Sequence, residues 1–337
     1  MTFEKITARQ VAKRAGVSQS AVSRVFTPGA SASKKTAEKV RQAATELGYR
    51  PNVLARSLIT GKSRIIGLVV AYLENNFYPE ALELLSNALQ QKGYHVLMFM
   101  ASQNSDDVSS VVDEILDYQV DGIVVASVAM TSNLAARCQS AGIPVVLFNR
   151  TQDDERMSSV TSDNKLGGRK VARFLLESGH SRIGFIAGWE GASTQRDRES
   201  GFVTELESQG HSLFSREVGN FDTDSAREAA RKMFGAVQIP DAVFVANDHM
   251  AFAVMDVLRF ELGLKIPQDV SVVGYDDVPL ASWPAYDLTT VRQPANRMVR
   301  ETVSILLSCI ENQDPTICRS IIDGPLILRG SSKPTEK

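Results

Sequence analysis

Three residues whose side chains suit a polar ligand stand where apolar stretches of the sequence end: Asn149, Asn247 and Asp276. A carboxylate accepts hydrogen bonds from neighbouring hydroxyls, whereas an amide both donates and accepts them. In doubly wound α/β folds, ligands bind beyond the carboxyl ends of the parallel strands. We therefore predict that these residues contribute to one site for a small polar molecule. For Asp276, a purely structural role as a helix cap stays open as an alternative.

A second set of polar residues indicates DNA recognition. Gln19, Ser20, Ser23 and Arg24 share the outer face of a short helix that we predict near the N-terminus. In a major groove, glutamine pairs with adenine, arginine pairs with guanine, and serine accepts several base edges. The helix therefore carries the side chains of a recognition helix. A small helical bundle without a role in DNA binding is the alternative.

Local capping signals place this helix in a helix-turn-helix. The spacing of Thr7 and Gln10 matches a capping box, which predicts a first helix over Thr7–Ala15. Gly16 supplies the turn, and Ser18 is a good N-cap for the second helix, Ser18–Phe26. Two short helices joined in this way present the second one to a DNA groove.

A third helix is predicted between its cap, Ser33, and its stop, Gly48. After it, Asn52–Ile59 has the length of two helical turns, which would be marginal alone in water. Beside a DNA-binding head, an exposed Leu58 can wedge between base steps in the minor groove. A plain linker is the alternative for this segment.

The charge of the chain is divided unevenly. Residues 1–62 carry twelve lysines and arginines against three acids, a formal net charge of +9. The remainder carries 25 basic and 36 acidic residues, a net charge of −11. A compact basic head on an acidic body is typical of a protein that binds a polyanion, most often nucleic acid. A solvated basic face without a partner is the alternative.

Composition and motifs exclude several other classes of protein. With 337 residues, 43% of them apolar, the chain is long enough for two or three domains. It contains no run of about 18 apolar residues, so we expect no membrane span. We see no secretory signal, and three cysteines without a CxxC pair indicate a reducing cytoplasm. No P-loop, calcium loop, metal-ligand spacing or nucleophile elbow occurs, so we expect no catalytic activity, no metal and no cofactor.

From Arg64 onward, apolar strand-like runs alternate with helical stretches. This pattern predicts an α/β body with parallel sheets covered on both faces, and two doubly wound lobes fit its length better than one. The predicted strands are Ile65–Ala71, Val96–Ala101, Gly122–Ser127, Val145–Asn149, Ile183–Gly188, Ala242–Asn247, Val270–Tyr275 and a last strand over Arg319–Leu328, followed by a frayed end.

Motifs along the whole chain resemble those of the lactose/galactose (LacI/GalR) repressor family. Each is weak alone, but they occur together and in order. In the head they are Val11–Ser18, Ala21–Val25, Leu47–Asn52 and Ala55–Leu58, and in the body Ser162–Asn164 with Gly167, Gly179–Ile183, Ala246–Asp248, Val272–Asp277 and Leu288–Pro294.

The resemblance implies an all-α helix-turn-helix head, a hinge helix that orders on DNA, and a periplasmic-binding-protein-like body of two lobes joined by three crossovers. It also implies a homodimer, a pseudo-palindromic double-stranded DNA operator, and a small effector between the lobes. Carried over by matching motif, the DNA-binding residues are Thr7, Ser18, Gln19, Ser20, Ser23, Arg24, Asn52, Ala55 and Leu58. The effector-binding residues are Asn149, Arg198, Asn247 and Asp276, with a looser match for Asp163, Phe221 and Gln293.

The chemistry of these residues suits a sugar or sugar acid. A guanidinium or a carboxylate holds two vicinal hydroxyls, and the ring of Phe221 can cover an apolar sugar face. A surface ion pair is the structural alternative for Arg198. Many sugar-binding members carry aspartate where this chain has Asn149, which is followed by Arg150. This departure weakens the case for a particular neutral sugar and leaves room for an acidic derivative.

We therefore predict a cytoplasmic, ligand-responsive transcriptional regulator that acts as a repressor. The expected domains are a helix-turn-helix domain at 1–50, a hinge at 51–63, and an effector-binding and dimerisation body at 64–332. Within the body, lobe 1 is expected at about 64–161 and 293–322, and lobe 2 at about 162–292 and 323–332. A sugar-binding protein without a DNA function would not explain the basic head, and an enzyme would need a catalytic constellation that the sequence lacks.

Overall fold

The computed structural model describes residues 6–27, 30–50, 62–101, 111, 113–127, 132–152, 156–312 and 316–335. The chain divides into two compact units. We call Met1–Arg64 the head and Ile65–Lys337 the body.

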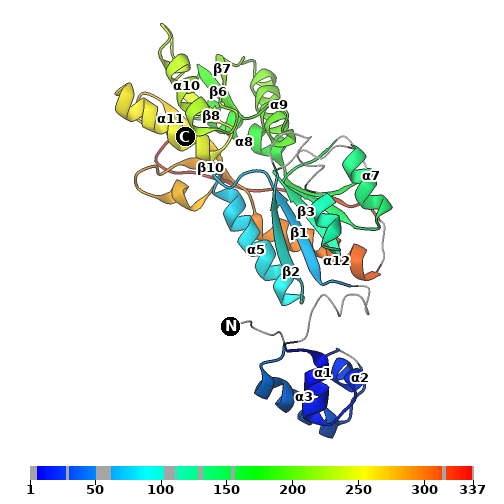
Figure 1. Cartoon of the computed structure of the whole chain (residues 1–337). Helices are drawn as coiled ribbons and strands as arrows, with labels where there is room; N and C mark the ends of the chain where they lie inside the picture. The colour runs from blue at the N-terminus through cyan, green and yellow to red at the C-terminus, as the bar shows by residue number, and fades with distance from the viewer. Residues whose placement is uncertain are drawn as a thin grey trace. The chain divides into compact units, whose positions relative to one another are not determined.

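The described residues of the head form three helices: α1 (Ala8–Ala15), α2 (Gln19–Phe26) and α3 (Lys34–Leu47), shown in Figure 1. The predicted capping box is present, because the Thr7 amide donates to Oε1 of Gln10 at 2.7 Å and the Gln10 amide donates to Oγ1 of Thr7 at 3.4 Å. Gly16 ends α1 with a φ of 67°, in the left-handed region that favours glycine. The helix-turn-helix prediction is confirmed.

A small apolar core holds the three head helices together. Val11, Val22 and Val40, one from each helix, are fully buried. Ala43 and Ala44 complete the buried set, and Val25 and Leu47 pack against it half-buried. Because each helix gives its apolar stripe to this core, the opposite face of α2 is left to solvent.

The body contains two six-stranded sheets, which we call sheet A and sheet B (Figure 1). Sheet A has the order β2–β1–β3–β4–β5–β11 and is parallel throughout. Its strands are β1 (Ile65–Val70), β2 (His95–Met100), β3 (Gly122–Ala126), β4 (Val145–Phe148), β5 (Ser158–Ser162) and β11 (Arg319–Ile322).

Sheet B has the order β7–β6–β8–β9–β10–β12, and only β12 runs antiparallel to its neighbour. Its strands are β6 (Ile183–Ala187), β7 (Ser215–Val218), β8 (Ala242–Val245), β9 (Ser271–Asp276), β10 (Thr289–Arg292) and β12 (Leu326–Ile327).

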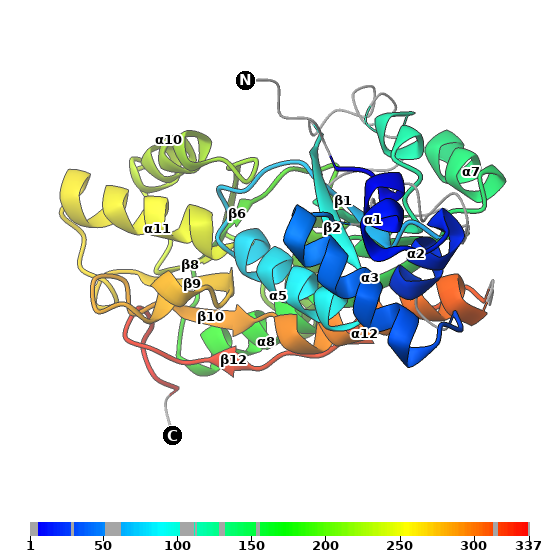
Figure 2. The same ribbon diagram turned by 60° about the horizontal axis from the view of Figure 1, so that its bottom comes forward.

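Helices cover both sheets. They are α5 (Phe77–Gln91), α7 (Ser132–Ser140), α8 (Asn164–Glu177), α9 (Ser193–Ser208), α10 (Thr223–Phe234), α11 (Asp248–Asp256), the π-helix η1 (Val257–Glu261), the 3₁₀-helix η2 (Pro279–Ser282) and α12 (Ala295–Asn312). Helices α5 and α12 lie side by side along sheet A (Figure 2), and α8 packs on α9 beside sheet B. Among the described helices, none has the length and apolar character to cross a membrane.

The chain passes between the two sheets three times. It leaves sheet A after β5, returns after β10 into α12, which packs on β3, β4 and β5, and crosses again between β11 and β12. The predicted fold class, a helical head followed by an α/β body of two parallel-sheet lobes, is confirmed.

Strands β5, β7 and β10 were not predicted, because the sequence of each is short and rich in polar residues. All five residues of β5 are nevertheless buried. Two of their hydroxyls are hydrogen-bonded: the Cys318 amide donates to Oγ of Ser158 at 3.1 Å, and Oγ of Ser162 donates to Oε1 of Gln293 at 3.0 Å. Buried polar groups are stable when they find such partners, so a search for apolar runs does not detect these strands.

The prediction of one strand over Arg319–Leu328 is wrong, since β11 and β12 belong to different sheets. The chain turns between them at Gly324, where a Cβ atom would lie 1.9 Å from the carbonyl oxygen of Arg292. The frayed end predicted from residue 330 is also wrong near its start. Ser331 is buried, and its hydroxyl donates to the carbonyl of Val272 at 2.6 Å.

Candidate functional site

The described polar residues that the sequence assigned to DNA lie on α2 and at the N-caps of α1 and α2. Thr7, Ser18, Gln19, Ser20, Ser23 and Arg24 are all exposed. Two of them also have a local role, because Thr7 caps α1 and Oγ of Ser18 accepts the Ala21 amide at 3.2 Å. The remaining three predicted DNA-binding residues, Asn52, Ala55 and Leu58, lie outside the described residues.

In the body, the predicted effector residues gather at the carboxyl ends of the strands. Asn149 follows β4, Asn247 lies two residues beyond β8, and Asp276 ends β9. Asn149 and Asp276 have positive φ angles of 57° and 130°, which non-glycine residues rarely adopt. Such strained backbone persists where the surrounding structure fixes it, often at ligand sites.

Asp276 is the centre of a buried hydrogen-bond network. Nε2 of Gln293 donates to its Oδ1 at 2.7 Å, and Nδ2 of Asn75 donates to its Oδ2 at 3.1 Å. Nη2 of Arg198 lies 3.4 Å from Oδ1. Burial raises the pKa of the Asp276 carboxyl, and the charge of Arg198 opposes this shift. Because its partners are side chains rather than the first turn of a helix, the helix-cap alternative for Asp276 is not supported.

Arg198 projects from α9 into the same network. Its Nε donates to Oδ1 of Asn164 at 2.9 Å, its Nη1 donates to the carbonyl of Ala246 at 2.5 Å, and its guanidinium carbon lies 3.7 Å from the ring centroid of Tyr275. The side chain is 3% exposed, so the surface ion pair considered from the sequence is wrong. Gly168 permits this placement, because a Cβ there would lie 2.1 Å from the Arg198 carbonyl oxygen.

Three buried polar atoms near these groups have no hydrogen-bond partner within the described part of the chain. They are Oδ1 of Asn149, Nε of Arg150 and Nδ2 of Asn247. Asn247 also caps α11, since its Oδ1 accepts the Met250 amide at 3.0 Å. Buried polar groups are normally paired, so these atoms are available to a bound molecule.

Two of the three loosely matched residues, Asp163 and Phe221, have structural contacts of their own. Oδ1 of Asp163 accepts the Leu166 amide at 2.9 Å and caps α8. Phe221 is buried after β7 with a φ of 59°, and its ring occupies the space where a Cβ on Gly188 would lie. Both residues therefore stand at the strand ends, and their role towards a ligand stays a prediction.

Sequence reasoning missed several members of the site, including Asn75, Asn164, Tyr275 and Trp189. Asn75 is 201 residues from Asp276 along the chain. The charges of Arg150, Asp276 and Arg198, which are distant from one another in the sequence, all affect the pKa of the Tyr78 hydroxyl, and burial raises that pKa. No local motif could indicate this convergence, which depends on how the ends of sheet A and sheet B meet.

Comparison with protein families covers both units. The family described as "Bacterial regulatory proteins, lacI family" matches residues 7–52, and the periplasmic binding protein-like domain matches residues 172–332. The HTH-type transcriptional repressor PurR of Vibrio atlanticus is 31% identical over 311 residues, which cover 91% of this chain and 93% of the relative. The chain belongs to the LacI family. Its members are transcriptional repressors, not enzymes.

Other relatives and solved structures agree with this family assignment. The probable HTH-type transcriptional repressor ExuR of Bacillus subtilis is 29% identical, covering 92% of this chain and 93% of the relative. A lac repressor dimer bound to operator and the anti-inducer ONPF has a TM-score of 0.88 and 26% identity, covering 97% of this chain and 99% of that one. A CelR–cellobiose complex has a TM-score of 0.73 and 30% identity, covering 97% and 100%.

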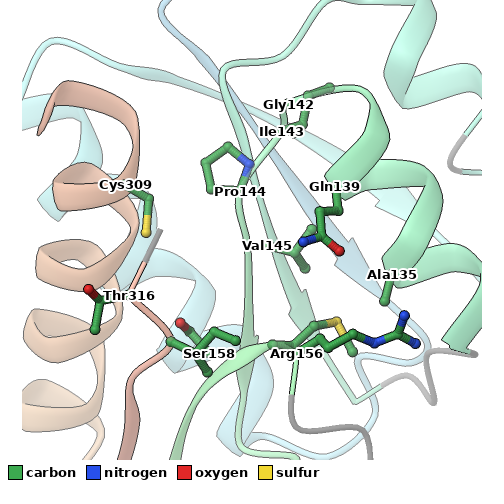
Figure 3. A pocket seen from close by; sticks show the side chains of 12 residues that line it. Ala135, Gln139, Gly142, Ile143, Pro144, Val145, Arg156, Ser158, Cys309 and Thr316 are labelled. Atoms are coloured by element: carbon green, nitrogen blue, oxygen red, sulfur yellow. The ribbon is translucent and has the colours of Figure 1, made fainter. Parts of the chain in front are cut away.

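Two cavities of the body lie outside the core of this site. One of about 370 Å³ touches it at Asp276 and Gln293, and none of the other predicted effector residues lines it. Another of about 400 Å³, between α7, β4 and the end of α12 (Figure 3), is lined by groups such as Gln139, Ser158 and Cys309. It contains no predicted effector residue, so we do not assign the LacI-family ligand to it.

Asp248, the residue after Asn247, connects the segment after β9 with strand β10. It is fully buried; its Oδ2 accepts the Val278 amide at 3.0 Å, and its Oδ1 accepts the Thr290 hydroxyl at 2.6 Å. Burial and the neighbouring Asp276 raise the pKa of Asp248 to about 8. The folded state therefore holds a proton that the unfolded chain loses near its ordinary pKa of 3.8. The contribution of Asp248 to stability falls as the pH rises from about 4 to about 8.

We expect Asp248→Asn to remove this pH dependence, because an amide imitates the protonated carboxyl. The melting temperature of the variant should match that of the wild type near pH 4 and exceed it by at least about 3 °C at pH 8.5. Differential scanning calorimetry across this range measures the difference. A constant offset between the two proteins at all pH values would show that Asp248 does not titrate there.

Proposed function

We propose that this LacI-family protein is a ligand-responsive repressor. Its affinity for a pseudo-palindromic DNA operator is controlled by a sugar or sugar derivative bound between sheets A and B. The observation that carries this proposal is the set of unpartnered buried atoms on Asn149, Arg150 and Asn247, at the strand ends that also hold the Arg198–Asp276 pair. A polyhydroxylated ligand supplies both donors and acceptors to such groups.

For the effector we assign Asn149, Arg198, Asn247 and Asp276 to direct binding, and Asp163, Phe221 and Gln293 to the border of the site. The proposed coupling runs through the hinge, where ordering of residues 52–59 on DNA costs conformational entropy. A ligand that changes the angle between the lobes changes the spacing of the two hinges in a dimer. Coupling free energies of this kind are typically about 1–3 kcal/mol.

For DNA we assign base contacts to α2 and a minor-groove contact to the hinge residues Asn52, Ala55 and Leu58. The exposed polar face of α2 supports the first assignment. Two findings support a dimer on an operator: the family relationship, and the structural similarity to a lac repressor dimer bound to operator. The cytoplasm is the proposed location, since the DNA lies there in a bacterial cell.

We also propose the domain division inferred from the sequence: 1–50 for DNA binding, 51–63 for the hinge and 64–332 for the effector body. Lobe 1 then comprises about 64–161 and 293–322, and lobe 2 about 162–292 and 323–332. The assignment of β1–β5 and β11 to sheet A, and of the other strands to sheet B, supports these limits.

A thermal-shift screen tests the effector proposal. Sugars, sugar acids and nucleobases are added singly to the full-length protein, because a ligand that binds the folded state raises its melting temperature. We expect a rise with a sugar or sugar acid and none with nucleobases. A rise with nucleobases alone would contradict a sugar-type effector.

Base recognition by α2 can be tested with Arg24→Ala. We expect the variant to lose about 10- to 100-fold in affinity for an operator selected from random duplex DNA by the wild type. Its affinity for unrelated DNA should change much less. Lys39→Ala, which removes an exposed charge from α3, is the matched control. It should weaken the affinity for the operator and the affinity for unrelated DNA by similar small factors. Equal losses on both DNAs for Arg24→Ala would indicate only a phosphate contact.

A further inference from the structure

Arg150 is a buried cation that forms no ion pair within the described part of the chain. It follows Asn149 at the end of β4 and is 5% exposed. Its guanidinium carbon lies 6.0 Å from the ring centroid of Trp189, which comes from the loop after β6. Its Nε has no hydrogen-bond partner, and no carboxylate forms an ion pair with it, among the described residues. A buried charge left in this state is unfavourable unless another group compensates it.

Arg198, in contrast, has hydrogen-bond and ion-pair partners that compensate its buried charge. Arg198 has the carboxylate of Asp276 at 3.4 Å, the side chain of Asn164 at 2.9 Å and the carbonyl of Ala246 at 2.5 Å. Its positive charge and the negative charge of Asp276 therefore balance each other. Among the residues that the structure describes, no comparable acid balances Arg150.

Arg150, Arg198 and Asp276 act on the same two tyrosines. Each of these charges acts on the hydroxyls of Tyr72 and Tyr78, whose pKa values burial raises. Of the three charges that act on both tyrosines, two are positive and one is negative, so these three groups together carry one net positive charge. His249 adds none near neutral pH, because burial lowers the pKa of its imidazole.

The N-terminus of helix α9 adds to the positive electrostatic potential beside Arg150. The Thr151 amide donates to Oγ of Ser193 at 3.0 Å, which places the residue after Arg150 at the N-terminus of the sixteen-residue helix α9. The N-cap residue of this helix, Ala192, provides no side-chain hydrogen bond to its first turn. The partial positive charge of a helix N-terminus favours an anion nearby.

We propose that the effector carries one carboxylate and that Arg150 binds it, so that the protein responds to a sugar acid and not to the corresponding neutral sugar. The inference deepens the proposed function and rests on it. The planar guanidinium matches a carboxylate with two parallel hydrogen bonds. The single excess charge favours a monoanion over a phosphate ester, which carries nearly two negative charges. The hydroxyls of the same molecule then reach Asn149 and Asn247.

Calorimetric titration of the full-length protein with matched compounds tests this inference. The probes are glucose, gluconate, glucuronate and glucose 6-phosphate, together with galactose, galactonate and galacturonate. We expect at least one sugar acid to bind at least about 10-fold more tightly than its neutral counterpart, and glucose 6-phosphate to bind more weakly than that acid. A neutral sugar that binds as tightly as its acids, or a phosphate ester that binds best, would overturn the inference.

Arg150→Gln provides a second, independent readout. The variant should lose about 10- to 100-fold in affinity for the sugar acid. Without ligand, its melting temperature should not fall below that of the wild type, because the substitution removes an uncompensated charge. Arg169→Gln, which changes an exposed arginine of α8, is the control and should leave acid affinity unchanged. Full acid affinity in Arg150→Gln, or a clear loss of stability without ligand, would contradict the role of Arg150.

The same titrations separate this inference from the proposed function. If a neutral sugar binds and alters operator affinity, the regulator stands and the carboxylate assignment fails. If a sugar acid binds at Arg150 but leaves operator affinity unchanged, the carboxylate assignment stands and the regulatory proposal fails. If neither sugars nor sugar acids bind at all, both fail.

Discussion

Removal of residues 1–62 is expected to abolish operator binding while leaving a folded, ligand-binding body. The head carries a formal charge of +9 and the body −11, so the truncated protein presents a net negative surface to DNA. The two units also have separate apolar cores, since the buried residues of the head form a cluster of their own. Phosphate contacts by the intact protein should make its affinity fall by about 10³-fold or more between 50 and 200 mM salt.

Fluorescence anisotropy with a labelled operator measures this loss, and far-ultraviolet circular dichroism confirms that the truncated body is folded. Ligand-induced thermal shifts should be the same in the full-length and truncated proteins. Salt-sensitive operator binding by the truncated body would contradict the assignment of DNA affinity to the head.

Replacing Arg198 or Asp276 by alanine is expected to remove the effector response. Each charged hydrogen bond to a ligand is worth about 1.5–3 kcal/mol, so we expect a loss of one to two decades in ligand affinity. The structure adds an effect on stability. The pair is almost fully buried, and removing one partner leaves the other charge uncompensated, at a cost of about 3–5 kcal/mol.

The double variant Arg198→Ala/Asp276→Ala separates these two effects. It lacks both charges, so it should be more stable than at least one of the single variants and still fail to bind effector. Operator affinity, measured below the melting temperature, should be retained in all three because the head is unchanged. Wild-type effector affinity in the double variant would show that the pair is only structural and that the ligand binds elsewhere.

The head was predictable because its determinants are local. The capping box at Thr7 and Gln10, the left-handed turn at Gly16 and the cap at Ser18 each lie within a few residues of the helix end that they define. Strand β5 had no comparable signal. Its serines and threonine are buried, and their partners, such as the amide of Cys318 and the side chain of Gln293, are distant in the sequence.

The effector site was predictable only in part for the same reason. Asn149 and Asp276 could be found because polar residues at the ends of apolar runs indicate a strand edge. Asn75 and Tyr275 could not, since their roles depend on contacts between the two sheets that no spacing rule encodes. Arg150 is the clearest case: its type was visible in the sequence, but its burial and the lack of a hydrogen-bond partner for its Nε among the described residues appear only in the fold.

The most direct test of the central claim is the linkage between operator and effector. Operator affinity is measured by anisotropy at fixed salt, with and without a saturating amount of the sugar or sugar acid that gives the largest thermal shift. Ligand affinity is then measured with and without operator. We predict that operator affinity changes by a factor of about 5–150, and that ligand affinity changes by the same factor, as thermodynamic linkage requires. Operator affinity that stays constant at saturating ligand would contradict the account.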